Sequence, residues 1–597
     1  MTAGIDRRSV LRGGGIAAAT LAAGAWLPAW ARPGTPGLDT LAPLSGEQIA
    51  LTIARQTMTI DGKQSHAVGV NGTVPAPLLR LREGQRLRVA VRNDLDESSS
   101  IHWHGLLVPA EMDGVPGISF PGIPPRSTFT YEFPVLQAGT YWYHSHSGLQ
   151  EQEGLYGPII IDPARPERVA YDRDHVIVLS DHADMDPHLA FKRLKQQGGY
   201  FNYQRQTLAG LLKGRDQSLG ERLRWGAMRM DPTDIADITG AAYRYLVNGH
   251  GLADGWTALF RPGERVRLRF INAGAMTFFN VRIPGLPMTI VQADGQDVRP
   301  VTVDEFQIGN AETYDVIVTP PEDRAYTIVA ESMDRSGMAR ATLAPRLGMA
   351  AEVPGLRPRP LATMKDMGMD MGDRNAGMNH AANGSDAEDH GQMAMGGEGH
   401  GGMQRDTTAG AMDMSMRNPK NAPGVTMGPG VQTIAPMPVD RTDSPGQGLE
   451  DVDHRVLTYR DLVALDRNPD ESAPIRSLEI HLTGNMERYM WSFDGVKMSD
   501  AREPIPFIKG ERVRITLIND TMMGHPIHLH GHFFELVTGR GAYGPRKHTV
   551  VVQPGGKTTF DLTADAVGDW AFHCHLLLHM HAGMMRVVSV RAPGDEA

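Results

Sequence analysis

The sequence predicts an all-β protein of three antiparallel β-sandwich domains, with a long insertion between the second and third domains. Three observations lead to this prediction: one strand pattern occurs three times, Gly and Pro turns are frequent, and long stretches of helical periodicity are absent. The chain of 597 residues contains 67 Gly and 41 Pro, and it is too long for a single hydrophobic core. Short strands separated by such turns are typical of sandwich folds.

The repeated pattern is a Gly turn followed by an alternating strand that ends at Asn. Its three copies are LREGQRLRVAVRNDL from Leu81, FRPGERVRLRFINAG from Phe260 and FIKGERVRITLINDT from Phe507. Alternation at period two indicates a half-buried strand, and three copies indicate three related domains. We expect these domains over residues 45–165, 170–345 and 446–597. Two stretches of the second domain, PHLAFKRLKQQ from Pro187 and residues 208–224, predict short helices in an insertion.

A methionine-rich insertion lengthens the interval between the second and third copies. The first interval, from Gly84 to Gly263, is 179 residues, and the second, from Gly263 to Gly510, is 247 residues. Residues 364–437 contain thirteen Met and three His but no Leu, Phe, Tyr or Trp. Such a composition offers too few apolar partners for a core, so residues 364–437 are predicted to be disordered, within a Met/His/Gly-rich linker over residues 346–445. Thioethers are soft donors that favour Cu(I), so this segment is also a candidate collector of cuprous ions.

Residues 1–31 are expected to be an export signal. Arg7 and Arg8 precede an Ala/Gly-rich apolar stretch, and small residues at 29–31 offer a cleavage site, a pattern that resembles a twin-arginine signal. We therefore expect export by the twin-arginine machinery into a bacterial periplasm. No later segment is long enough to span a bilayer, and no cysteine near the N-terminus offers a lipid anchor, so no stable membrane anchor is expected. The net charge of −10, without a basic run, argues against a nucleic-acid partner.

Histidine pairs occur at matched positions in the first and third repeats. IHWHG places His102 and His104 at 18 and 20 residues after Gly84, and IHLHG places His528 and His530 at the same offsets after Gly510. Later in each repeat a second pair follows, in GTYWYHSHS (His144 and His146) and in GDWAFHCHL (His573 and His575). The second repeat has no histidine at the comparable places, which indicates a domain without metal ligands.

The only cysteine, Cys574, lies between His573 and His575. It cannot form an internal disulfide, and on a strand it points away from its two neighbours. A thiolate with two imidazoles and a weak axial Met is the ligand set of a blue copper site, and His525, His579 and Met584 are available to complete it. Eight histidines remain, which is too many for one metal but suits a three-copper cluster between two domains.

These motifs resemble those of the multicopper oxidases. The family pattern HxHG, HxH, HxxHxH and HCHxxxHxxxGM is matched by HWHG, HSH, HPIHLH and HCHLLLHMHAGM. The resemblance implies cupredoxin-like Greek-key domains and four coppers per chain. It makes His525, Cys574, His579 and Met584 the type 1 ligands, and His102 and His528 the type 2 ligands. The type 3 pair would then be held by His104, His144, His146, His530, His573 and His575.

The same resemblance implies a catalytic acid and a reaction. Asp113, nine residues after His104, matches the family's acid beside the cluster, although an Asp-Gly turn is the alternative interpretation. Many related oxidases carry a carboxylate just after the second type 1 histidine, where this chain has Met580 and His581, so the rest of the proton route stays open. Cys574 would take electrons from substrate, and O2 would be reduced to water.

Within the family, the stretch NDTMMGHPIHLHG from Asn519, the twin-arginine signal and the Met/Asp/Gly/His insertion together resemble the periplasmic copper resistance protein CopA family, over essentially the whole mature chain. That resemblance implies Cu(I) as substrate, together with small phenolic compounds. Two alternatives stay open: a general laccase-type phenol oxidase, and a copper-sequestering protein with secondary oxidase activity. A two-domain copper nitrite reductase fits less well, because its type 1 cysteine is not flanked by both type 3 histidines.

Overall fold

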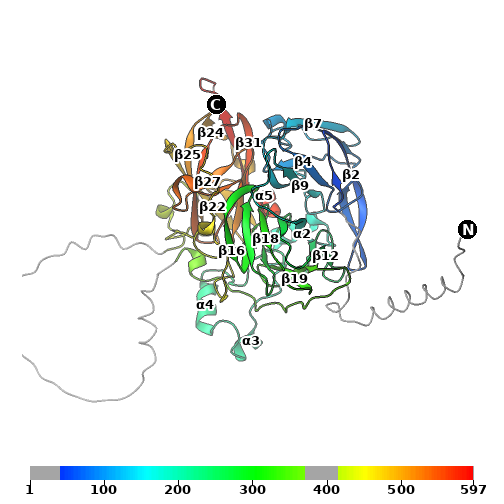
Figure 1. Ribbon diagram of the computed structural model, residues 1–597. Helices are drawn as coiled ribbons and strands as arrows, with labels where there is room; N and C mark the ends of the chain where they lie inside the picture. The colour runs from blue at the N-terminus through cyan, green and yellow to red at the C-terminus, as the bar shows by residue number, and fades with distance from the viewer. Residues whose placement is uncertain (1–40, 370–414, 596–597) are drawn as a thin grey trace, which may run out of the picture.

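Strands form nearly all of the regular structure of the protein (Figure 1). The computed structural model describes residues 41–369 and 415–595, and within them six main sheets follow one another in pairs along the chain. The all-β prediction is therefore confirmed. The predicted export signal at 1–31 lies outside the described residues. Within the described ranges, no helix is both long and apolar enough to cross a membrane.

The first sandwich is drawn in blue to cyan in Figure 1. In spatial order its four-stranded sheet consists of β3 (Lys63–Val70), β2 (Gln48–Ile60), β5 (Arg86–Asn93) and β7 (Thr128–Pro134). Its five-stranded sheet consists of β1 (Pro43–Leu44), β4 (Leu78–Arg82), β9 (Tyr156–Asp162), β8 (Gly139–His144) and β6 (His102–His104). A short 3-10 helix, η2 (Ala110–Met112), follows β6 and ends at Asp113.

The second sandwich pairs a six-stranded with a five-stranded sheet. The larger sheet consists of β11 (Arg244–Val247), β10 (Arg173–His182), β13 (Val266–Asn272), β18 (Thr313–Val318), β15 (Met288–Ala293) and β16 (Gln296–Val303). The smaller sheet consists of β12 (Trp256–Leu259), β20 (Met338–Ala344), β19 (Tyr326–Ser332), β14 (Phe279–Arg282) and β17 (Glu305–Ile308).

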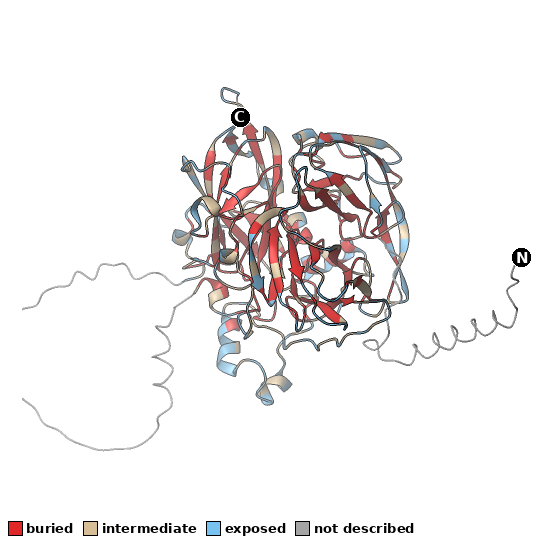
Figure 2. Cartoon of the chain, in the orientation of Figure 1, coloured by how far each residue is buried: buried red, intermediate tan, exposed pale blue. Residues whose placement is uncertain are grey.

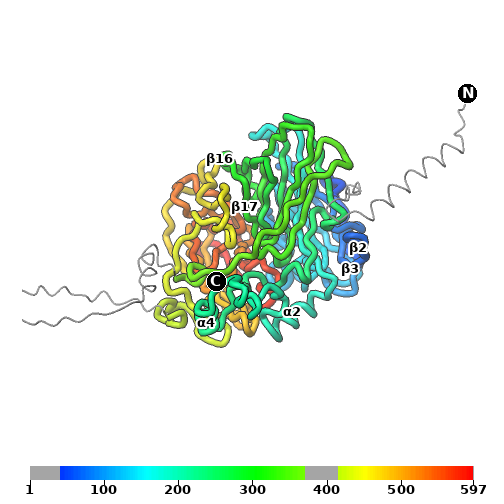
Figure 3. The backbone as a smooth tube through the Cα atoms, turned by 90° about the horizontal axis from the view of Figure 1, so that it is seen from below, coloured from blue at the N-terminus to red at the C-terminus, as the bar shows by residue number. Residues whose placement is uncertain are grey.

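Three short helices lie between β10 and β11, and the prediction of helices in this insertion is confirmed. They are α2 (Pro187–Gln196), α3 (Leu208–Leu212) and α4 (Leu219–Ala227). Each begins after a side-chain cap, from Asp186, Thr207 and Ser218 respectively, which satisfies backbone N–H groups of the first turn. Seen from below, α2 and α4 lie along one edge of the molecule (Figure 3).

The third sandwich is yellow to red in Figure 1. One sheet consists of β23 (Met490–Phe493), β22 (Arg476–Asn485), β25 (Arg512–Asn519), β30 (Gly556–Thr563), β27 (Phe534–Leu536) and β28 (Arg546–Lys547), with β21 (Val439–Asp440) beside β30. The other consists of β24 (Ile505–Ile508), β32 (Met585–Arg591), β31 (Gly568–Cys574), β26 (His525–Leu529) and β29 (Thr549–Val552). Helix α5 (Leu577–Ala582) follows β31. The remaining 3-10 turns are η3 (Lys365–Met367), η5 (Pro419–Asn421), η6 (Tyr459–Asp461), η7 (Met498–Asp500) and η8 (Gly541–Tyr543).

The three sequence repeats adopt the same local structure, at the glycine turn and at the terminal asparagine. The turn glycine of each copy has a left-handed backbone, with φ of 87°, 83° and 84° at Gly84, Gly263 and Gly510, a conformation that glycine adopts at little cost. The terminal asparagine of each copy is buried, and its side-chain amide donates to a backbone carbonyl of a later segment. These bonds join Asn93 to Ile123, Asn272 to Ile308 and Asn519 to Val552.

The sheets are mixed, although the sequence pattern predicts antiparallel ones. In each sandwich the repeated strand runs parallel to an earlier strand of the same sheet: β5 beside β2, β13 beside β10 and β25 beside β22. In the first sandwich the chain passes through the facing sheet, at β4, before it returns as β5. Strand β3, which comes between β2 and β4 in the chain, pairs antiparallel with the other edge of β2. The chain that leaves this sheet as β3 and returns as β5 has therefore reversed its direction, which alternation along one strand does not reveal.

The prediction of a disordered linker over 364–437 is wrong at both ends of that range. On the N-terminal side, Met367 is buried in turn η3. On the C-terminal side, Val425, Val431 and Ile434 form a small apolar cluster with Ala422. This stretch lies against the third sandwich, to which it is joined by the bond from Gln432 N to Gly484 O (2.8 Å). A few apolar residues suffice here because hydrogen bonds to the third sandwich, such as that from Thr433 Oγ1 to Asp520 O (2.6 Å), also hold the stretch in place. Residues 370–414 lie outside the described residues.

The hydrophobic core crosses a domain boundary. One contiguous cluster of buried side chains includes residues of both the second and the third sandwich, whereas most of the first sandwich has a cluster of its own. Figure 2 shows the buried residues concentrated on the strands of all three. The second sandwich is thus packed firmly against the third, which carries most of the predicted metal ligands.

Candidate metal centres

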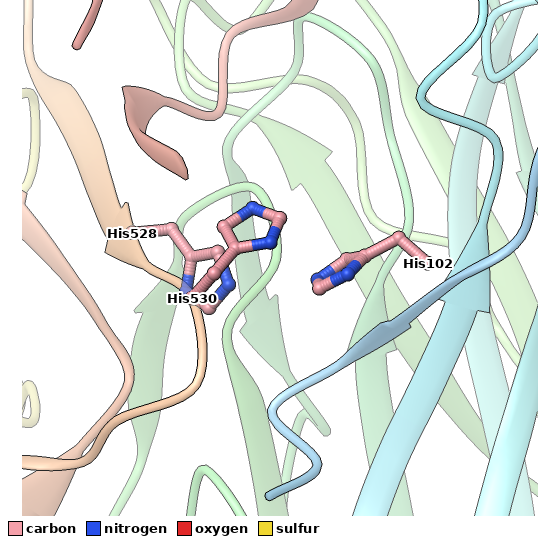
Figure 4. Close-up of side chains that lie close together, drawn as sticks. All are labelled: His102, His528 and His530. Atoms are coloured by element: carbon pink, nitrogen blue, oxygen red, sulfur yellow. The ribbon is translucent and has the colours of Figure 1, made fainter. Parts of the chain in front are cut away.

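Four strands bring the predicted cluster histidines together. In the first sandwich, β6 and β8 pair so that His102 lies opposite His144. In the third, β26 and β31 pair so that His528 lies opposite His573. Figure 4 shows His102 facing His528 and His530 across the space between these two sandwiches. The eight predicted cluster histidines therefore meet at one interface, and seven of them are buried.

Within this cluster several groups of three histidines, some of which overlap, have ligand atoms close enough together to hold a metal ion. Two trios with no common member each place their ligand atoms within 4.8 Å of one another: His104, His144 and His575, and His146, His530 and His573. Each trio combines residues of the first and third sandwiches. The two remaining histidines, His102 and His528, have ring centroids 5.9 Å apart. His102 also belongs to two overlapping groups, one with His144 and His146 and one with His528 and His530.

Hydrogen bonds fix the orientation of the cluster imidazoles. The Nδ1 atoms of His102 and His573 donate to the carbonyls of Asp113 (2.8 Å) and Cys574 (3.0 Å). The Nδ1 atom of His528 donates to the backbone carbonyl of His548 at 2.6 Å. Because Nδ1 is held in this way, Nε2 is the atom left to face the cluster, and such outer contacts commonly orient metal ligands.

The donor atoms fit a bound metal. The Nε2 atoms of His102, His144 and His528 are buried without a hydrogen-bond partner, as are both ring nitrogens of His104. Buried polar atoms are rarely left so in folded proteins. The pKa of His104 is lowered well below its usual value, mainly by burial and next by the charge of His528. Neutral imidazoles with unpartnered nitrogens are suitable copper ligands.

A second centre surrounds Cys574. Its Sγ lies 3.5 Å from His525 Nδ1 and 3.9 Å from His579 Nδ1, and these two nitrogens are 3.3 Å apart. Burial raises the pKa of the Cys574 thiol, so a bound metal is needed to hold it as the thiolate. The three donors converge as a small soft-metal site requires.

Met584 is tied to this centre through its backbone. The Cys574 N–H donates to Met584 O at 3.1 Å, and the Met584 N–H donates to His579 O at 3.0 Å. The Met584 side chain is fully buried. These bonds keep the predicted axial methionine beside two of the other predicted ligands.

Both imidazoles of the Cys574 centre are held from behind. Thr521 Oγ1 lies 2.8 Å from His525 Nε2, and His579 Nε2 donates to Asp237 Oδ2 at 2.7 Å. The Tyr489 hydroxyl donates to the same oxygen of Asp237 at 2.7 Å. Asp237 belongs to the second sandwich, so that domain contributes to the site although it supplies none of the predicted ligands.

Two buried carboxylates contact the cluster. Asp113 Oδ2 accepts from His530 Nδ1 at 2.8 Å, and Oδ1 lies 3.2 Å from His102 Nδ1. The sequence-based prediction placed Asp113 beside the cluster but did not identify the second carboxylate, Glu151, whose Oε2 lies 2.6 Å from His144 Nδ1. Burial raises the pKa of Glu151 well above its usual range.

Sequence reasoning missed three residues for different reasons. Glu151 lies in QEQEG, where the pattern does not distinguish it from Glu153. Asp237 has no motif, because it reaches His579 from 342 positions away in the chain. His548 is a lone histidine in RKHT, yet its ligand atoms group with those of His104 and His528.

Comparisons with known proteins agree with this geometry. Sequence profiles of the multicopper oxidase family match residues 52–166, 173–346 and 472–594. Copper resistance protein A of Escherichia coli is 49% identical over 98% of this chain and 99% of its own. A copper resistance protein A homolog of Pseudomonas syringae pv. tomato is 48% identical over 98% of this chain and 99% of its own.

Solved structures share the fold. Fet3p, a multicopper oxidase that functions in iron import, superposes with a TM-score of 0.61 at 18% identity, covering 92% of this chain and 90% of its own. The laccase from Botrytis aclada superposes with a TM-score of 0.59 at 20% identity, covering 94% of this chain and 89% of its own. The predicted set of three cupredoxin-like sandwiches is confirmed.

The family profiles cover most of the chain, and the relative from Escherichia coli matches it almost from end to end. The chain therefore belongs to the multicopper oxidases and, within them, to the family of copper resistance protein A.

Proposed function

We propose that this protein oxidises Cu(I) to Cu(II) in the bacterial periplasm and thereby protects the cell from copper. Four Cu(I) ions give up four electrons, and one O2 takes them with four protons to form two waters. As a multicopper oxidase, the protein holds four coppers per chain: one type 1, one type 2 and two type 3. The observation that carries the proposal is the position of Cys574, which joins a convergent thiol–imidazole centre to the histidine cluster through its own chain neighbours.

We assign the ligands as the motifs imply. His525, Cys574, His579 and Met584 hold the type 1 copper, and His102 and His528 hold the type 2 copper. The type 3 pair is held by the two trios, His104, His144 and His575 on one side and His146, His530 and His573 on the other. The trios support this assignment because each supplies three imidazoles from two domains.

When bound, the coppers supply one-electron oxidation at the Cys574 centre and reduction of O2 at the cluster. The protein's own residues orient and connect these sites. Cys574 is linked by single peptide bonds to His573 and His575, which belong to different trios. Asp113 spans the cluster between His102 and His530, where it is placed to hold a proton close to the site of O2 reduction.

A small cavity beside the Cys574 centre favours Cu(I) over a phenol as the preferred substrate. It is lined by Met276, Met333 and Met523 together with Asp237 and Asp334, and Asp237 contacts His579 directly. Thioethers are soft ligands that prefer Cu(I), while the carboxylates complement its charge.

We further propose that residues 370–414 collect cuprous ions. This range contains seven Met and three His, and it is separate from the flanks at 364–369 and 415–437 that pack on the third sandwich. For location we propose the periplasm, reached by the twin-arginine route, on the basis of Arg7 and Arg8.

Replacement of 370–414 by a Gly/Ser linker of equal length tests the collector. We expect full copper loading and unchanged phenol oxidation, with a higher apparent KM for Cu(I) at buffered low copper and little change in kcat. A matched variant keeps the length and charges but changes the seven methionines to Ser. Equal Cu(I) kinetics in all three proteins would reject the collector, and phenol turnover far above Cu(I) turnover in the parent would favour a laccase.

A further inference from the structure

Helices α3 and α4 expose apolar side chains on the surface of the second sandwich. In Figure 1 the two helices project from the lower edge of the body, and Figure 2 colours most of their length as exposed. Leu208 and Leu212 on α3 are 70% and 80% exposed, and Leu219 and Leu223 on α4 are 57% and 65% exposed. Each pair has the spacing i, i+4, which places both members on one side of their helix. Exposed apolar side chains gathered in this way mark an interaction site.

The two helices form one unit, which we call the α3–α4 hairpin (residues 205–229). The Arg222 guanidinium joins them, since Nη1 donates to Thr207 O at 2.8 Å and Nε donates to Gln217 O at 3.0 Å. Trp225 on α4 is only 3% exposed and packs in the core shared by the second and third sandwiches. The exposed leucines are therefore held on a supported surface.

The α3–α4 hairpin is basic, although the whole chain has a net charge of −10. It contains six Arg or Lys and two acidic residues, which gives 6 − 2 = +4. Both acidic side chains have partners: Asp216 lies 2.8 Å from Arg359, and Glu221 accepts from Ser218 at the start of α4. Three exposed cations of the hairpin form no ion pair with the described residues: Lys213, Arg215 and Arg224.

The insertion between the second and third sandwiches has the opposite charge. Residues 370–414 contain eight acidic residues and two Arg, which gives 2 − 8 = −6, together with seven Met. The described flanks on both sides of this range are bonded to the hairpin or to the chain just after it. The Ala362 N–H donates to Pro232 O at 2.8 Å, and Gln432 Nε2 donates to Arg229 O at 3.3 Å. Both attachment points of the acidic segment are thus tied to the basic surface.

We propose that residues 370–414 dock on the α3–α4 hairpin, with their carboxylates against its free cations and their methionine side chains against its leucines. Because both flanks are fixed beside the hairpin, docking is intramolecular, an advantage that no separate partner has. The chain continues from α4 to Ile235 and Asp237, which line the cavity beside Cys574. A role of the docked thioethers in Cu(I) delivery rests on the proposed function, whereas the docking itself does not.

Carbodiimide cross-linking of the copper-loaded full-length protein, read by mass spectrometry, tests the docking. This reagent joins an amine directly to a carboxylate, and Lys213 is the only lysine of the hairpin. We expect Lys213 to be linked to acidic residues of 370–414, with a yield that falls as salt is added. Arg215→Gln combined with Arg224→Gln keeps Lys213 and should lower the yield by about 5–10-fold.

Arg82→Gln combined with Arg265→Gln is the matched control. It removes the same charge from exposed positions of the first and second sandwiches, and it should give the parent yield of Lys213 links. Leu212→Ser combined with Leu223→Ser leaves every charge in place and should also lower the yield, because the apolar part of the contact is lost. A yield that is equal in all of these proteins would overturn the docking.

Cross-linking a mixture of unlabelled and heavy-isotope-labelled protein identifies the occupant. Links within one chain support the docking, whereas links only between light and heavy chains would overturn it in favour of a second copy. Without links from Lys213 to 370–414, binding to phosphatidylglycerol vesicles that Arg215→Gln with Arg224→Gln weakens would overturn it in favour of a lipid surface. Links within the parent chain, with an unchanged apparent KM for Cu(I) in that variant, would keep the docking and reject the delivery role.

Discussion

His579 Nε2 donates to Asp237 Oδ2 at 2.7 Å, so a carboxylate of the second sandwich orients an imidazole of the Cys574 centre in the third. The same carboxylate lines the methionine-rich cavity. The bond directs Nδ1 of His579 toward Cys574, and the negative charge favours the more highly charged state of a bound copper. We therefore expect the second domain to tune the copper centre at Cys574.

Asp237→Asn is expected to raise the reduction potential of the type 1 copper, because a charge that favours Cu(II) is removed. We also expect kcat/KM for Cu(I) to fall by about 10–100-fold, the usual effect of losing an outer-shell partner. Asp334→Asn changes another carboxylate of the same cavity and should leave the potential unchanged. A redox titration that gives equal potentials for Asp237→Asn and the parent would show that this bond does not tune the centre.

Asp113→Asn should leave reduction of the type 1 copper by substrate fast and slow its reoxidation by O2, by about 100-fold. Asp113 contacts His102 and His530 inside the cluster, where protons are consumed. Stopped-flow traces of the two half-reactions separate these effects. Glu111→Gln, at an exposed position two residues earlier, is the control. Normal O2 consumption in Asp113→Asn would return Asp113 to the role of a turn residue.

Glu151→Ala should weaken copper binding at the type 3 pair by about 10–100-fold, because His144 loses the group that orients its Nδ1. Glu151→Gln retains an oxygen acceptor and should retain most of the copper. The number of coppers retained per chain after dialysis against a chelator measures the effect of both substitutions. Glu153→Gln, on a partly exposed side chain near Arg55, should match the parent. Equal copper retention in Glu151→Ala would mean that His144 is held by its strand alone.

Asp234 gives the protein a predicted pH dependence of stability. Burial raises its pKa to about 7 in the folded state, with the nearby charges of Asp237 and Asp231 adding to the effect. The unfolded chain loses this proton near pH 4. Between these values the folded state binds more protons, so stability falls as pH rises, by roughly 4 kcal/mol at most.

The Asp234→Asn variant has no ionisable group at this position, so its stability should not fall in this way as pH rises. The melting temperature of the variant should exceed that of the parent by more at pH 8 than at pH 5. Thermal unfolding followed at both pH values provides the measurement. A difference between variant and parent that stays constant with pH would contradict the raised pKa of Asp234.

The strands and the histidine motifs could be predicted from the sequence because both depend on short-range spacing. Alternation at period two located β5, β13 and β25, and the separation of His102 from His104 placed both on β6. Neighbouring strands then brought these short motifs together, as pairing of β6 with β8 illustrates.

The supporting residues could not be predicted because their partners are distant in sequence. Asp237 and Asp294 reach the third sandwich from loops of the second, and only tertiary packing brings them to His579 and His548. The ordered flank around Val425 and Ile434 was missed for the same reason. Its apolar residues looked too few because the hydrogen-bond partners that also hold it lie elsewhere in the chain.

The central claim is that Cys574 holds the copper through which all substrate electrons pass. The most direct test compares the copper-loaded parent with Cys574→Ser, by visible absorption and by Cu(I)-dependent O2 consumption. The parent should show an intense absorption band at about 600 nm from thiolate–copper bonding. Cys574→Ser should fold, retain the three cluster coppers, lose the band and consume no O2. Persistence of the band or of O2 consumption in Cys574→Ser would contradict this account.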